Sequence, residues 1–148
     1  VNDVLTPDFR DGRFMTMALL LIDPGGRRAR WASAGHDPPI VYEPRKDSFR
    51  DLDGGDVPLG VLAGTSYRDY DLEGLEPGSL MVIGTDGIWE ASGESGEQFG
   101  HDRLKELLRA NSGRAAPEIA GAIDAALRAF LGPARAKDDV TYAIARLG

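Results

Sequence analysis

The chain has 148 residues, enough for one domain that buries roughly two-thirds of its unfolded surface. Its formal net charge is −7, which argues against nucleic-acid and anionic-membrane partners because both attract basic surfaces. The absence of cysteine excludes disulfides, zinc–thiolate sites and thiol nucleophiles, and fits a reducing, cytoplasmic location. No apolar run approaches the ~20 residues of a membrane-spanning helix.

The first half of the chain predicts strands that are joined by turns and one long loop. The apolar run Met15–Ile22 predicts a central strand, and the turn residues Asp23–Gly26 predict a hairpin with the strand that follows. The polar stretch Pro44–Asp56 predicts a surface loop. The expected strands up to residue 83 are 15–22, 30–34, 40–42, 67–72 and 80–83.

The second half predicts two helices and a final strand. Asp102 is the expected N-cap of a helix over Arg103–Ala110, with leucines on one face. Pro117 is expected in the first turn of a longer helix that ends at Leu131. A strand over Val140–Ile144 closes the chain. The fold class is therefore α+β.

Two aspartates lie at the ends of predicted strands. Asp86 follows the buried run 80–83, and Asp138 with Asp139 precedes the last strand, 52 residues later. Carboxylates at strand ends are well placed to hold Mg²⁺ or Mn²⁺, which prefer oxygen ligands, and such sites suit chemistry on phosphates. The alternative is that Asp86-Gly87 forms a turn and that Asp138-Asp139 is a solvated loop.

Several short motifs together resemble the SpoIIE/RsbU-like branch of the metal-dependent type 2C (PPM) serine/threonine phosphatases. The order and spacing of these motifs carry the resemblance, which runs over almost the whole chain. They are Phe14-Met15-Thr16, Ala34-Gly35-His36-Asp37-Pro38-Pro39, Pro58-Leu59-Gly60-Val61, Leu75-Glu76-Pro77-Gly78, Thr85-Asp86-Gly87-Ile88-Trp89-Glu90-Ala91, Phe99-Gly100 and Asp138-Asp139-Val140-Thr141.

The resemblance implies a β-sandwich flanked by helices on both faces, with two Mn²⁺ or Mg²⁺ ions at one end that activate a water for attack on a phosphoserine or phosphothreonine. Asp86 and Asp138 would be the metal ligands and carry the catalysis. Asp139 would be an auxiliary carboxylate, and Gly87 would let the backbone turn close to the metals. A turn glycine with no metal role is the alternative for Gly87.

The first metal motif of the family, a strand that ends in Gly-Asp-Val-x-Gly-His-Gly, does not occur in residues 1–148. We therefore expect a single phosphatase domain that lacks its N-terminal strands and the metal-bridging aspartate, with residues 1–5 as the tail of a helix. Such a chain is expected to bind metal weakly and to dephosphorylate poorly. Missing strands expose sheet edges, so we also expect pairing at such an edge with a second copy in a homodimer, with a swapped element or with the chain's own missing segment.

Two functions from different classes remain open. The first is a phosphatase whose substrate, by resemblance, is a phosphorylated anti-anti-sigma (STAS-type) protein in a partner-switching pathway. The second is a non-catalytic, phosphatase-like binding module. His36 is either a general acid or, more simply, a loop histidine that ties down the Pro38-Pro39 turn. Trp89 is expected in the core over the site, and Lys137 is either a phosphate contact or a solvated side chain.

Overall fold

The computed structural model describes residues 1–9, 12–23, 27–133 and 138–148, which divide between two units. Unit 1 comprises Val1–Pro39 and Leu52–Leu75, and unit 2 comprises Ile40–Asp51 and Glu76–Gly148. The predicted turn at Asp23–Gly26 falls, after its first residue, outside the described residues, and so does Lys137.

Unit 1 is a three-stranded antiparallel sheet in the order β1-β2-β5. Its strands are β1 (Met17–Ile22), β2 (Arg28–Ala34) and β5 (Asp69–Glu73). The predicted hairpin is confirmed, because β1 pairs with β2 from Met17↔Ala34 to Ile22↔Ala29. The chain starts in a short helix, α1 (Asn2–Leu5).

The two faces of the unit 1 sheet differ in burial. Trp31 is 2% exposed and stacks on Tyr70 of the neighbouring strand, with ring centroids 4.7 Å apart. The alternate residues of β1 point the other way, and Leu19 and Leu21 remain 60% and 73% exposed. A strand that exposes apolar side chains on one face is unusual at a surface in contact with water.

Unit 2 is a four-stranded antiparallel sheet in the order β4-β3-β6-β7. Its strands are β3 (Ile40–Glu43), β4 (Ser48–Arg50), β6 (Leu80–Gly84) and β7 (Tyr142–Arg146). The prediction of a continuous loop over Pro44–Asp56 is wrong, because β4 lies within it. Phe49 packs on Tyr42 across the β3–β4 pair, with centroids 4.7 Å apart, and such a cross-strand aromatic pair stabilises a strand that has no local signal of its own.

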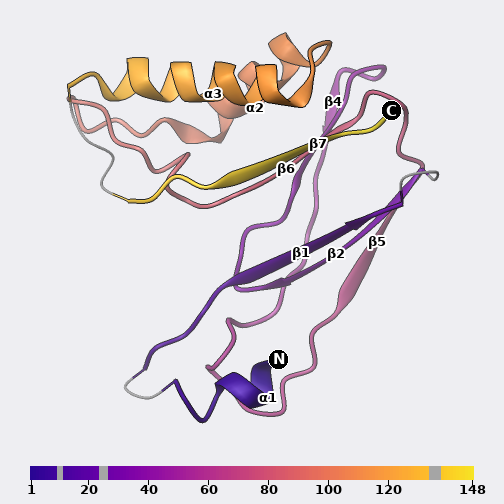
Figure 1. Cartoon of the computed structure of the whole chain (residues 1–148), viewed down its shortest axis with the longest axis vertical. Coiled ribbons are helices and arrows are strands. Elements are labelled where there is room, and N and C mark those ends of the chain that lie inside the picture. Colours follow the sequence, from indigo (N-terminus) through magenta and orange to yellow (C-terminus); the bar gives the residue numbers. More distant parts are fainter. Residues whose placement is uncertain (10–11, 24–26, 134–137) are drawn as a thin grey trace. The chain divides into compact units, whose positions relative to one another are not determined.

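Two helices cover this second sheet, α2 (Gly100–Asn111) and α3 (Ala116–Leu131). Figure 1 shows both on one side of the sheet that contains β6 and β7. The core between them contains fully buried side chains from both helices and from β6, among them Leu80, Leu104, Leu108, Ile119 and Ile123. Among the described residues, no helix has the length and apolar character that crossing a membrane requires.

The start of α2 differs from the prediction. Asp102 is not the N-cap, since the helix begins at Gly100 and Phe99 precedes it, with no side-chain cap. Phe99 is 2% exposed, and the Gly100 N–H donates to the Trp89 carbonyl at 2.9 Å, so packing and a backbone bond set this boundary. Asp102 lies in the first turn, where its carboxylate still complements the helix dipole.

The buried carboxyl of Glu43, whose side chain is 5% exposed, should make the stability of the fold depend on pH. The hydrogen bond from Arg50 (2.7 Å) is the main cause that lowers the pKa of this carboxyl below its usual 4.5, and Lys46 acts in the same direction. A depressed pKa in the folded state stabilises the fold above the unfolded-state pKa, and this stabilisation is lost as pH falls through the folded-state pKa. Glu43→Gln should therefore cost about 1–3 kcal/mol near pH 7 and much less in strong acid.

Urea unfolding at several pH values tests this expectation, with the exposed Glu106→Gln as the matched control. A constant difference between Glu43→Gln and the parent chain from neutral to acid pH would contradict it.

Candidate metal-binding site

The pairing of β6 with β7 brings the predicted site residues to one edge of the unit 2 sheet. The last ladder pair is Gly84↔Tyr142, and the Thr85 N–H continues the ladder by donating to the Thr141 carbonyl at 2.9 Å. Asp86 comes just after the end of β6, and Asp139 comes just before the start of β7. The two predicted metal-ligand segments therefore leave the same end of neighbouring strands.

Gly87 shows how closely these segments approach. A Cβ atom at this position would lie 2.4 Å from the carbonyl oxygen of Asp139 and 3.1 Å from its carbonyl carbon. Real Cβ atoms essentially never come this close to backbone atoms. Glycine is required here by contact between the two segments, which goes beyond the role of an ordinary turn glycine.

Asp86 lies in a turn that presents its side chain to solvent. The Ile88 N–H donates to the Thr85 carbonyl at 3.1 Å, and the Glu90 N–H donates to the Asp86 carbonyl at 2.8 Å. Ile88 is fully buried beneath this turn, whereas the side chains of Asp86 and Glu90 are exposed. The buried isoleucine anchors the turn and leaves the carboxylate accessible.

Asp138 and Asp139 are both exposed on the opposite segment. One carboxylate oxygen of Asp138 accepts the Asp139 N–H at 2.8 Å, which orients the side chain. The segment leads into Tyr142, whose hydroxyl donates to the Asp124 carboxylate on α3. Burial, assisted by this bond, raises the pKa of Tyr142, so the hydroxyl keeps its proton and fixes the start of β7 to the helix.

The donor chemistry at this edge fits a hard divalent cation. Asp86 and Asp138 offer carboxylate oxygens, and accessible carboxylates leave room for the waters that Mg²⁺ retains. Within the described part of the chain, however, no three or more His, Cys, Asp or Glu side chains form a group that could hold a metal ion. These residues offer oxygen ligands to a cation but do not complete a closed coordination shell.

Trp89 and His101 form a contact that the sequence did not predict. Trp89 is half-buried against the unit 2 core, as expected, and the exposed His101 stacks on it with ring centroids 4.4 Å apart. The pair connects the turn after Asp86 to the start of α2. Only the two separate aromatic residues are visible in the sequence, and nothing in their spacing of 12 positions indicates contact.

His36 and Asp37 belong to unit 1. The Ser33 hydroxyl accepts the His36 N–H at 3.0 Å and donates to the His36 carbonyl. These backbone bonds support the prediction of a loop-forming residue. They give no role to the imidazole.

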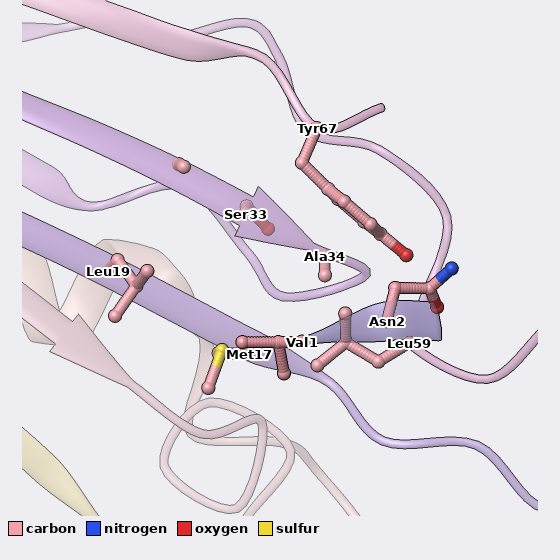
Figure 2. Close-up of a pocket in the computed structure, with 9 residues that line it drawn as sticks. Val1, Asn2, Met17, Leu19, Ser33, Ala34, Leu59 and Tyr67 are labelled. Carbon is pink, nitrogen blue, oxygen red and sulfur yellow. The ribbon is translucent and has the colours of Figure 1, made fainter. Parts of the chain in front are cut away.

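A separate cavity of about 210 Å³ lies in unit 1. Figure 2 shows Leu19 and Met17 of β1 beside it, together with Leu59. Its lining residues are Val1, Asn2, Met17, Leu19, Ala32, Ser33, Ala34, Leu59 and Tyr67. None of them carries a formal side-chain charge, so this cavity is unsuited to a phosphate group.

Comparison with known proteins decides the family. A family model described as Stage II sporulation protein E (SpoIIE) matches residues 1–148. The chain belongs to the SpoIIE family. This membership confirms the predicted resemblance to SpoIIE/RsbU-like phosphatases.

Individual relatives and solved structures are similar to much of the chain. The chain is 29% identical over 96 residues to phosphoserine phosphatase RsbU of Bacillus subtilis (strain 168), which covers 65% of this chain and 28% of that protein. It matches the SiaA-PP2C domain of Pseudomonas aeruginosa with a TM-score of 0.74 and 27% identity, over 88% of this chain and 51% of that chain. It also matches the phosphatase domain of SpoIIE from Bacillus subtilis (Mn presoaked), with a TM-score of 0.66 and 19% identity, over 89% of this chain and 56% of that chain.

These likenesses confirm the predicted α+β fold class, with two antiparallel sheets as in PP2C domains. The chain spans 28% of the length of RsbU and about half (51%) of the SiaA domain.

Substitution of Gly87 tests whether the two segments must touch. Gly87→Ala should displace the Asp139 peptide and lower the free energy of unfolding by about 1–3 kcal/mol, as overpacking does. Gly121→Ala is the matched control, because a Cβ at this position of α3 meets nothing within 4 Å and should stabilise the helix by about 1 kcal/mol. Chemical denaturation measures both, and equal stability of Gly87→Ala and the parent chain would show that the segments do not touch.

Proposed function

We propose that this chain contributes to a metal-dependent protein serine/threonine phosphatase. The observation that supports this most strongly is the meeting of the Asp86 and Asp138 segments at one edge of the sheet, within a chain of the SpoIIE family. The reaction is hydrolysis of a phosphomonoester: water adds to phosphorus, the bond from phosphorus to the serine or threonine oxygen breaks, and that oxygen takes up a proton.

In this proposal Asp86 and Asp138 are the metal ligands and the residues on which catalysis depends. Bound Mn²⁺ or Mg²⁺ would lower the pKa of a water and offset phosphate charge. Gly87 keeps the two segments in contact, and Asp139 adds negative charge at the rim. Both aspartates are exposed to solvent.

The substrate we propose is a phosphorylated regulatory protein of the anti-anti-sigma (STAS) type. The support is the resemblance of the motif set to RsbU-like phosphatases, together with 29% identity to a protein named phosphoserine phosphatase. The net charge of −7 makes a nucleic-acid partner unfavourable.

A non-catalytic binding module is the second candidate. The observation in its favour is that the described residues bring no third His, Cys, Asp or Glu to the two aspartates. Solvent-facing carboxylates on two touching segments favour the enzyme, because they offer the oxygen ligands that a hard divalent cation prefers.

Calorimetric titration with Mn²⁺ distinguishes the two candidates. We expect weak, saturable binding by the parent chain and at least a tenfold loss, about 1.4 kcal/mol, in both Asp86→Asn and Asp138→Asn. Hydrolysis of a phosphoserine peptide should be slow and should require the metal. Exposed Asp102→Asn is the matched control and should bind as the parent does. Binding that is equal in all four proteins would contradict the metal site.

We also propose that the chain forms a homodimer through the edge of β1. Among the described residues, β1 pairs only with β2. All six residues of Met17–Ile22 are apolar, with no charged side chain to block pairing. Two copies related by a two-fold axis would place apolar residues opposite apolar residues in an antiparallel β1–β1 pair.

Light scattering tests the dimer. Leu21→Lys on β1 should shift the chain to a monomer, because an edge lysine opposes strand pairing. Leu62→Lys is the matched control, since Leu62 is 61% exposed but lies outside the strands. A monomeric parent chain, or a dimer that survives Leu21→Lys, would contradict pairing at this edge.

A further inference from the structure

Thr85 lies at the point where β6 and β7 stop pairing and the two metal-ligand segments begin. Its hydroxyl accepts the Thr141 N–H at 3.1 Å and lies 3.1 Å from the Asp139 carbonyl and 3.3 Å from the Thr141 carbonyl. A hydroxyl donates one hydrogen bond. The Thr141 carbonyl already accepts the Thr85 N–H at 2.9 Å, and the Asp139 carbonyl is the nearer of the two acceptors for the hydroxyl.

The backbone of Asp139 connects Thr85 to a proposed ligand. Its carbonyl, in the peptide to Val140, accepts from Thr85 and lies against Gly87. Its N–H, in the peptide from Asp138, donates to the Asp138 carboxylate at 2.8 Å. Displacement of the Asp139 backbone would therefore disturb the Asp138 side chain, and the Thr85 hydroxyl, just after β6, holds that backbone in place.

We infer that Thr85 is a positioning residue: its hydroxyl fixes the backbone of Asp139 and thereby orients the Asp138 carboxylate toward the Asp86 segment before a cation binds. This inference rests on the proposed function. The hydroxyl holds the segment of Asp138 against the segment of Asp86 in the metal-free chain. Groups that orient ligands in this way typically change metal affinity by about 10–100-fold.

The test compares Thr85→Val, which keeps the branched shape but removes the hydroxyl, with Thr85→Ser, which keeps the hydroxyl. Mn²⁺ affinity is measured from paramagnetic broadening of amide NMR signals, which detects weak binding. Amide exchange at Asp139 and Thr141 is measured without metal. We expect Thr85→Val to weaken Mn²⁺ binding about 10–100-fold and to speed exchange at both amides, and Thr85→Ser to restore both to within about threefold.

Two controls separate the possible failures. Thr65→Val removes a comparable hydroxyl bond, to the Leu62 carbonyl at 2.8 Å in unit 1, and should leave Mn²⁺ binding unchanged. Thr85→Val with the parent's Mn²⁺ affinity, or Thr85→Ser as impaired as Thr85→Val, overturns the inference while the proposed function stands. A parent chain that binds Mn²⁺ no better than Asp86→Asn overturns the proposed function and the inference with it.

Discussion

The antiparallel pairing of β6 with β7 is the interaction on which the candidate site depends. It joins two segments that lie 52 positions apart in the sequence and stops just before both aspartates. A ladder of backbone hydrogen bonds fixes position along the strands, since a slip of one residue would turn every side chain to the other face. The identity of the residues at the strand ends is therefore as important as the pairing itself.

The packing of unit 2 makes this pairing rigid. β6 is buried through most of its length, with Leu80, Met81 and Val82 each at most 2% exposed. The helices α2 and α3 cover the sheet with fully buried leucine and isoleucine side chains, and Tyr142 ties the first residue of β7 to α3. A site on a rigid sheet edge keeps its ligands oriented more accurately than a site on loops alone. Core packing thus fixes the strand register, and the register in turn fixes the placement of Asp86 and Asp138.

The strands that build this edge are visible in the sequence because each apolar stretch borders a turn signal: Gly84 ends the first, and Asp138-Asp139 precedes the second. Metal-ligand candidates at their ends follow from the same pattern. The sequence does not reveal β4, which depends on Phe49 packing across to Tyr42, or the start of α2, which depends on burial of Phe99. It indicates Gly87 but not the reason for it, because the carbonyl that excludes a side chain comes from Asp139, far along the chain. Nothing in the sequence indicates the role of Thr85 except that a hydroxyl side chain precedes an aspartate. Long-range contacts of this kind have no periodicity to detect.

A crystal soaked in Mn²⁺, with anomalous diffraction recorded at the manganese absorption edge, tests most directly whether the two segments form one site. We predict an anomalous peak within coordination distance, about 2.0–2.5 Å, of carboxylate oxygens from both Asp86 and Asp138. A peak bound to only one of them, or none at this edge of the sheet while Mn²⁺ occupies another place on the chain, would contradict the proposed convergence.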